Sequence, residues 1–411
     1  MSQTAAPLSR PTGRCATRKP RSDTNEIERL LAFTERPDII SFAIGLPADE
    51  TFPMAAVRAA AAEALDEAGP SGLQYCPTPG ITALRETLAR HMRSLTGGSF
   101  SVANVLVTTG AQQALDLVGR ELLSPGDRLG IQSPTYFGAL AAWKPHGLRF
   151  QRVGIDEEGA IGAGATPPAI AYIQPRFCNP TGSSLTAAQK HEMLELSASS
   201  GMRIIEDDAY AALAFDPNDP DTRLPMVANG PFENDEYVGD VIYIGTVSKL
   251  IAPALRTGWV VANRATIARL SAAKEGMDLC GSALNQHIVH RLFRDVICES
   301  YIEGLRQVYR ERCEKLTAAL RLELPAFVQF EKPGGGIFLW LRFPPGWDTG
   351  ELLEYAANAG TVFYPGRGFY ASGGAQTYAR LNFSSQAAGA LEEGAKRLAR
   401  AIHEYAAARG L

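Results

Sequence analysis

A lone lysine at the end of an apolar segment is the first candidate for chemistry. In "VIYIGTVSKLIAPALRTGWV", residues 241 to 260, Lys249 follows a run of apolar and small hydroxyl residues, and Arg256 follows seven positions later. A solvated surface lysine is the ordinary alternative. Burial of the amine, however, lowers its pKa and makes it a nucleophile toward carbonyl groups. Lys249 is therefore predicted to form a Schiff base with an aldehyde cofactor.

A phosphate on that cofactor would find ligands in "TTGAQQAL". Gly110, Ala111 and Gln112 open a predicted helix, where free backbone N–H groups and the helix dipole favour an anion. Thr246 and Arg256 would add a hydroxyl group and a fixed positive charge. The alternative is an ordinary corner between a strand and a helix.

Two further segments carry groups suited to a pyridine ring. "IIEDDAY" places Asp207 directly after an apolar strand, where a carboxylate would keep the ring nitrogen protonated. A helix N-cap or a solvated turn is the alternative for this aspartate. "NPTG" is a turn signature, and its Asn179 is predicted to donate a hydrogen bond to a phenolate oxygen on the ring.

The elements that must position these groups are short apolar strands separated by helical patterns. Such strands indicate a largely parallel sheet buried on both faces, with its chemistry at the carboxyl ends of the strands. The strand segments are 105–110, 128–134, 169–175, 202–210, 241–249 and 258–263.

The pattern changes in the last third of the chain. One long helical pattern covers about 283–317, and "FVQFEKPGGGIFLWLRF" and "TYARLNFSS" then indicate an antiparallel sheet between two more helices. This favours a second, smaller α+β domain. The predicted division is a disordered extension (1–22), a segment packing with the small domain (23–59), a large α/β domain (60–285) and the small domain (286–411).

Composition excludes several classes of protein. A net charge of −4 argues against a nucleic-acid surface, and no apolar run approaches the roughly 20 residues that span a bilayer. Six dispersed cysteines without a CxxC pair indicate reduced thiols, so we expect a cytoplasmic protein. "HEMLE" lacks the second histidine of a zinc site, and no metal is implied. The basic first 22 residues fit a disordered extension or a transit peptide.

From about Ser22 onward the sequence resembles the fold-type-I pyridoxal phosphate enzymes. The specific resemblance is to class I/II aminotransferases of the aspartate, kynurenine and 2-aminoadipate group, whose fold implies a large domain with a mostly parallel, seven-stranded sheet. The matching segments, in family order, include "LQYCPTPGITALRETLA", "VTTGAQQALDLV", "SPTYFG", "CNPTG", "EDDAY", "SKLIAPALRTGW", "PGGGIFLWL", "PGRGF" and "ARLNFSS".

The resemblance implies roles for single residues. Lys249 would hold pyridoxal phosphate and then act as the base, and Asp207 would pair with the ring nitrogen. Asn179 and Tyr210 would bond the ring oxygen, with Tyr136 stacked on the ring face. The other implied residues are the phosphate ligands Ala111, Gln112, Thr246, Ser248 and Arg256, the partner subunit's Tyr75, and the substrate-binding Arg380 and Gly45.

One departure from the family pattern bears on the substrate. Glu28 stands where relatives commonly have an arginine that reaches the substrate side chain, and Asp49 adds a second acid. A reversed charge would favour a basic or guanidino side chain. The alternative is that Glu28 lies on a solvated helix face and pairs with Arg29 or Lys19.

The expected activity is transamination between an L-amino acid and a 2-oxo acid by a homodimer with shared active sites. Decarboxylation, elimination and oxygen-dependent oxidation are alternatives, because the same cofactor supports them. The effector domain of a transcription regulator is an alternative of another class. Because only some 22 residues precede the family match, a DNA-binding domain is not expected before it.

Overall fold

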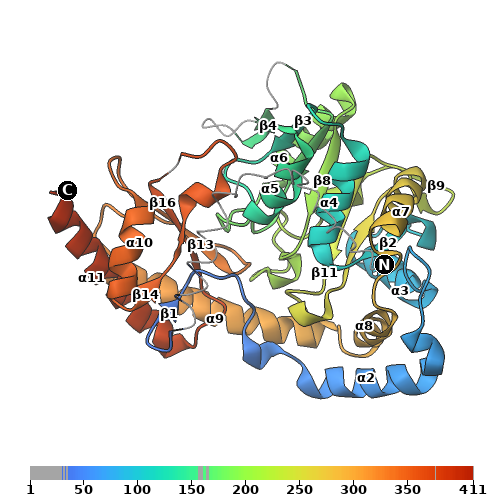
Figure 1. Cartoon of the computed structure of the whole chain (residues 1–411), viewed down its shortest axis with the longest axis horizontal. Coiled ribbons are helices and arrows are strands. Elements are labelled where there is room, and N and C mark those ends of the chain that lie inside the picture. Colours follow the sequence, from blue (N-terminus) through green and yellow to red (C-terminus); the bar gives the residue numbers. More distant parts are fainter. Residues whose placement is uncertain are drawn as a thin grey trace, which may run out of the picture.

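A seven-stranded sheet forms the centre of the computed structural model, which describes residues 30, 33, 36–155, 161–162, 166–374 and 376–410 (Figure 1). Its order differs from the order in the chain, as expected when helices connect parallel strands. The strands, from one edge to the other, are β2 (Val105–Thr108), β12 (Gly258–Val261), β11 (Val241–Thr246), β8 (Arg203–Asp207), β7 (Ile170–Ile173), β3 (Arg128–Ile131) and β4 (Arg149–Arg152).

Five of these strands, β11, β8, β7, β3 and β4, run parallel to one another, whereas β12 is antiparallel to both of its neighbours. The predicted mostly parallel sheet is confirmed. The sequence segments predicted six of its strands. They missed β4, because this edge strand is not apolar throughout. Its residues are exposed or half-buried, and an arginine stands at each of its ends.

Helices cover both faces of this sheet, as the continuous apolar strands require. Side chains of α4, α5 and α7 pack in one core cluster, and those of α3, α6 and α8 pack in the other. Alternation along β2 fits this: Leu106 belongs to the first cluster, whereas Val105 and Val107 belong to the second. The bounds are α3 (Thr82–Thr96), α4 (Gly110–Leu122), α5 (Phe137–Trp143), α6 (Ala187–Ser200), α7 (Arg264–Asp278) and α8 (Ala283–Asp295).

A three-stranded antiparallel sheet lies at the other end of the molecule, beside the last helices. Its strands are β13 (Phe338–Arg342), β16 (Tyr378–Asn382) and β15 (Tyr364–Pro365). The antiparallel pairing of β13 with β16 was predicted. The remaining elements are α2 (Met54–Ala68), α9 (Glu299–Glu323), α10 (Thr349–Asn358), α11 (Ala388–Arg409) and the short strands β1 (Ile40–Ser41), β5 (Gly154–Ile155), β6 (Ile161–Gly162), β9 (Phe232–Glu233), β10 (Glu236–Tyr237) and β14 (Thr361–Val362).

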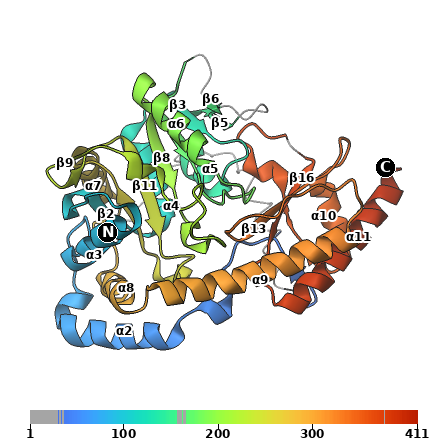
Figure 2. The same ribbon diagram turned by 180° about the vertical axis from the view of Figure 1, so that it is seen from behind.

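The helix predicted over 283–317 is wrong as a single element, because the chain breaks between α8 and α9 at residues 296–298. Figure 2 shows α9 running from the large sheet to the small one, where it packs against α11. Near the N-terminus, β1 pairs in parallel with β14. The four-part division of the chain stays a prediction.

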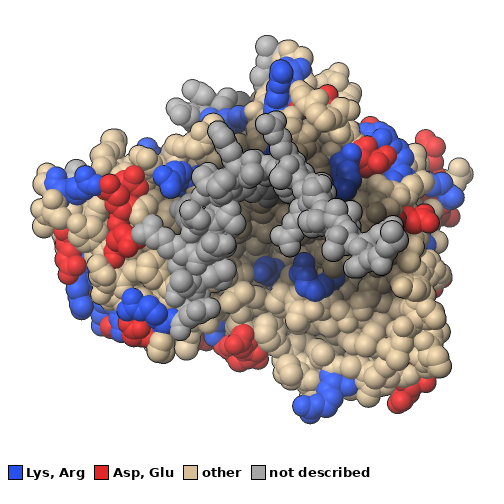
Figure 3. All heavy atoms as spheres, in the orientation of Figure 1, with Lys and Arg blue, Asp and Glu red and all other residues tan. Residues whose placement is uncertain are grey.

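Charged side chains on the surface are mixed in sign. On the face shown in Figure 3, most acidic groups have basic groups beside them, and neither sign forms a continuous field. Within the described ranges, no helix has the length and apolar character needed to cross a bilayer.

Candidate active site

Lys249 lies just after β11, at the carboxyl end of the central sheet. Its side chain is half-buried, and its Nζ donates a hydrogen bond of 2.7 Å to the carbonyl oxygen of Gly45. Burial, together with the positive charges of Arg380 and Arg256, lowers the pKa of the amine to about 8. A much larger fraction of the amine is therefore neutral near pH 8 than for an ordinary lysine, as a nucleophile and base requires.

Asp207 ends β8, the strand next to β11, so its carboxylate lies at the same edge of the sheet. Its Oδ2 accepts hydrogen bonds from the Tyr172 hydroxyl (2.6 Å) and from Gln174 Nε2 (3.1 Å). Its Oδ1 is buried and has no protein partner. Burial raises the pKa of Asp207 to about 6, the two hydrogen bonds oppose the rise, and the neighbouring Asp208 adds to it. The free oxygen fits a ring N–H donor.

The start of α4 forms an anion cradle with the loop after β11. Gly110 has φ +76°, and a Cβ there would lie 2.6 Å from Arg256 Nη2, so the guanidinium group lies directly against the helix start. Arg256 itself has φ +44°, a strained conformation that is typical of functional positions. Thr246 Oγ1 donates to Ser248 Oγ at 3.0 Å beside them. This set of donors fits a phosphate group.

The other two predicted residues at the helix start have different roles. Ala111 offers only its backbone N–H there, which is the group that a phosphate needs. The Gln112 side chain instead donates to the Gly138 carbonyl oxygen at 2.7 Å, so it ties α4 to α5.

Arg380 is completely buried on β16 and points into the same cavity. It donates to Asn179 Oδ1 at 2.8 Å and to the Ala43 carbonyl oxygen at 2.6 Å, while its Nε has no partner. Burial lowers its pKa, to about 10, which leaves it a cation at neutral pH. Arg380 is therefore not a solvated strand residue. A buried guanidinium with a free N–H fits a carboxylate.

Lys249 and Arg380 line one cavity of about 220 Å³. Tyr136, Asn179, Tyr210 and Gly45 also line it, whereas Asp207 and the residues of the anion cradle are not part of its lining. Aromatic rings hold Arg380 in place: its guanidinium carbon lies 4.2 Å from the ring centre of Phe338, and the rings of Phe137, Tyr364 and Phe369 lie within 6.0 Å.

Two of the predicted residues, Tyr75 and Asp49, are exposed at the surface and do not line the cavity. The Tyr75 side chain is 78% exposed. Glu28 lies outside the described residues. The sequence reading also missed the partners of Asp207. Tyr172 lies on β7 and Gln174 follows this strand, two positions later. Polar groups at that spacing beside an apolar strand were the signal that could have identified them.

The orphaned Asp207 oxygen, the anion cradle and the amine of Lys249 fit pyridoxal phosphate. The large sheet and this set of groups define a pyridoxal phosphate-dependent enzyme of fold type I. When bound, this cofactor supplies an electrophilic carbon and a ring that accepts electrons.

Comparisons with known proteins agree. The family model described as "Aminotransferase class I and II" matches residues 37–398. The 2-aminoadipate transaminase of Thermus thermophilus is 36% identical over 390 residues, which are 93% of this chain and 94% of the relative. This chain belongs to the class I and II aminotransferases, and it is a pyridoxal phosphate-dependent aminotransferase.

Two solved structures are similar in both sequence and fold. Kynurenine aminotransferase from Pyrococcus horikoshii, in complex with PMP and KYN, is 34% identical with a TM-score of 0.85, and the match covers 92% of this chain and 94% of that one. An alpha-aminoadipate aminotransferase from Thermus thermophilus, complexed with N-(5'-phosphopyridoxyl)-L-leucine, is 35% identical with a TM-score of 0.82, covering 93% and 95%. Both similarities place this chain near the aminoadipate and kynurenine enzymes.

Proposed function

We propose that this aminotransferase takes its amino group from L-amino acids with apolar or aromatic side chains and passes it to a 2-oxo acid. The observation that carries the proposal is the cavity lining. Beside the polar groups at the reacting centre, the wall consists of Leu30, Ile44, Phe137, Phe338 and Tyr364. Burying an apolar side chain against such a wall is favourable, whereas burying an unpaired charge there is costly.

The residues would divide the work as follows. Arg380 binds and orients the α-carboxylate, because its free Nε and its planar fork match that group. Lys249 Nζ removes the α-proton and returns a proton at the end of the half-reaction, since its lowered pKa lets it do both near neutral pH. Asp207 Oδ1 holds the proton of the ring nitrogen in place. The aromatic wall excludes water from the reacting atoms.

The relatives support a broad choice of side chain. They are named for acidic and aromatic substrates, and one was solved with a leucine adduct. A basic or guanidino donor remains a second proposal for this chain. What supports it is the charge reversal at Glu28 in the sequence and the position of Leu30, two residues later, in the cavity wall.

A donor panel tests both proposals. We would measure 2-oxo acid and carbon dioxide released from leucine, phenylalanine, glutamate and arginine, with and without oxygen, in wild type and in Glu28→Gln. Leucine and phenylalanine should give the highest kcat/KM. A preference for arginine that Glu28→Gln abolishes would support the basic pocket instead. Carbon dioxide release or a need for oxygen would contradict transamination of that donor.

We also propose a homodimer, in which Tyr75 reaches the phosphate of the partner's site. Its side chain has no place in its own cavity and is 78% exposed. A tyrosine hydroxyl suits a phosphate oxygen, and C2 dimers place the same surface on both partners.

A further inference from the structure

Asp208, which follows Asp207 in the chain, forms a buried ion pair with Arg176. Successive side chains on a strand point to opposite faces, so Asp207, which contacts Tyr172 and Gln174, faces one side of β8 while Glu206 and Asp208 face the other. Asp208 is buried there and accepts hydrogen bonds from Arg176 Nε at 3.0 Å, from Arg176 Nη2 and from the Tyr243 hydroxyl at 2.9 Å.

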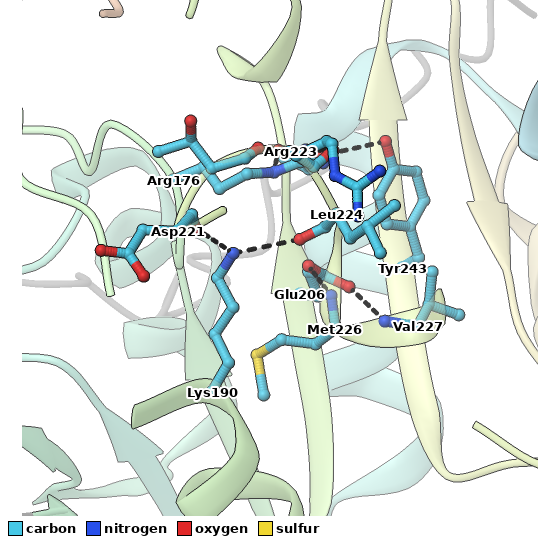
Figure 4. A network of polar contacts seen from close by, with 11 residues as sticks. Arg176, Lys190, Glu206, Asp221, Arg223, Leu224, Met226, Val227 and Tyr243 are labelled. Carbon is cyan, nitrogen blue, oxygen red and sulfur yellow. Dashed lines mark hydrogen bonds and ion pairs between the residues drawn. The ribbon is translucent and has the colours of Figure 1, made fainter. Parts of the chain in front are cut away.

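Arg176 is itself completely buried and has a second set of contacts. Its Nη1 donates to the carbonyl oxygens of Thr222 at 3.0 Å and of Arg223 at 3.3 Å. Figure 4 shows its side chain between these carbonyls and the Tyr243 strand. Burial favours the neutral form of Arg176, but Asp208 and Tyr243 more than offset this and raise its pKa, so the side chain stays a cation.

We propose that Arg176 is a positioning residue for the reaction. Its guanidinium group pairs with the Asp208 carboxylate and offsets the negative charge there, so that Asp207 stays ionised beside pyridoxal phosphate. This rests on the proposed function of Asp207. Ionising two carboxylates on neighbouring residues in a buried site has a high free-energy cost, because each negative charge disfavours the other. A guanidinium held by a two-point contact on one of them removes that conflict.

Other polar and titratable groups surround the two carboxylates. Those that influence Asp207 from the cavity side or share its surroundings are Tyr172, Gln174, Tyr136, Tyr210, Cys178 and Arg380. Those that influence or lie near Asp208 are Tyr243, Glu206, His91 and Lys190. Within the described part of the chain, the ion pair of Asp208 is made by Arg176. Lys190 bonds to the backbone carbonyls of Asp221 and Leu224 instead.

The test compares Arg176→Met, Asp208→Asn and the double variant. The dissociation constant of pyridoxal phosphate is measured against pH by quenching of tryptophan fluorescence, which needs no turnover. In Arg176→Met, the pH below which affinity is lost should rise by about one unit or more, because Asp208 is left as an uncompensated neighbouring charge. In Asp208→Asn that pH should fall, since the like charge is gone and the cation remains. The double variant should return close to wild type.

A purely structural role would weaken both single variants without moving these midpoints in opposite directions, and that result would overturn the inference. Arg291→Met is the matched control, because it removes a buried arginine that pairs with Glu67 and not with Asp208, and it should leave the midpoint unchanged. If Arg176→Met does not fold, Tyr243→Phe should give a smaller upward shift, and an unmoved midpoint there contradicts the proposal. Wild type that does not bind pyridoxal phosphate would instead overturn the proposed function.

Discussion

At the scale of single residues, Asp207 is held where ionisation is costly. It is buried, one of its oxygens has no partner, and its pKa rises from 3.8 to about 6, chiefly through burial. A group whose pKa is raised in the folded state contributes stability that is fully present below its unfolded pKa. This contribution is lost as the pH rises through the folded pKa. Without its cofactor, the protein thus carries a stability cost at this position above pH 6.

Replacing the carboxylate should therefore separate stability from activity. Asp207→Asn keeps an oxygen for Tyr172 and Gln174 but removes the charge, so the apoprotein should gain up to about 3 kcal/mol above pH 6, from a shift of roughly two pKa units. The gain should vanish below about pH 4. Urea unfolding of the apoprotein at pH 4 and pH 8 measures it, and transamination should be nearly lost. Equal stability of both proteins at pH 8 would contradict this account.

At the scale of elements, buried charges fasten the loop 221–227 to the sheet. Lys190 on α6 donates to the carbonyl oxygens of Asp221 and Leu224, and Glu206 on β8 accepts from the backbone N–H groups of Met226 (2.7 Å) and Val227 (2.9 Å), as Figure 4 shows. An irregular buried segment must satisfy its backbone groups in this way. The loop is thereby ordered against the strand that carries Asp207.

Lys190→Met should loosen this loop. The change leaves two carbonyl groups without their donor while keeping the apolar stem, so it should lower the free energy of unfolding by about 1–3 kcal/mol. Urea unfolding is the measurement, and hydrogen exchange should speed up at the loop residues first. Lys315→Met is the matched control: that lysine pairs at the surface with Glu311 and is 40% exposed, so its loss should cost under about 1 kcal/mol. Equal losses of unfolding free energy in the two variants would contradict the role of Lys190 in holding the loop.

At the scale of the whole molecule, several large apolar side chains on α2, in the segment after it and at the end of α7 are exposed. Met54, Leu65, Leu73, Tyr75 and Leu279 are all exposed in the single chain. The segment is tied to the start of α8, since Cys76 Sγ donates to the Gly281 carbonyl oxygen at 3.4 Å. An exposed apolar patch of this kind typically marks a protein interface, which fits the proposed dimer.

Leu73→Asp should therefore shift the protein toward monomers. Sedimentation velocity measures the effect, and pyridoxal phosphate affinity should fall with it, because Tyr75 would no longer reach the partner's site. Leu322→Asp is the control: Leu322 is 81% exposed on α9, outside the patch, and its change should leave the oligomeric state intact. A wild-type monomer, or equal dissociation of both variants, would exclude this face as the interface.

The sequence by itself determined the sheet and the chemical groups. Strands buried on both faces are apolar throughout, so six of the seven strands could be predicted from the sequence. Lys249 and Asp207 could be identified as polar groups at the carboxyl ends of two of them. The family resemblance then supplied the single roles, and the family, the fold and the cofactor were confirmed. A local sequence pattern is sufficient to predict an element where burial or backbone geometry determines the residue type.

Only the tertiary structure decided what surrounds those groups. Contacts between segments distant in sequence have no local signature: Arg380 joins Asn179 across 201 positions, and Lys249 joins Gly45 across 204. The same holds for Tyr172 on Asp207 and Arg176 on Asp208, which depend on β7 lying beside β8. The charge state of a buried group is set by neighbours that folding brings together, so it follows from the packed structure and not from the order of residues.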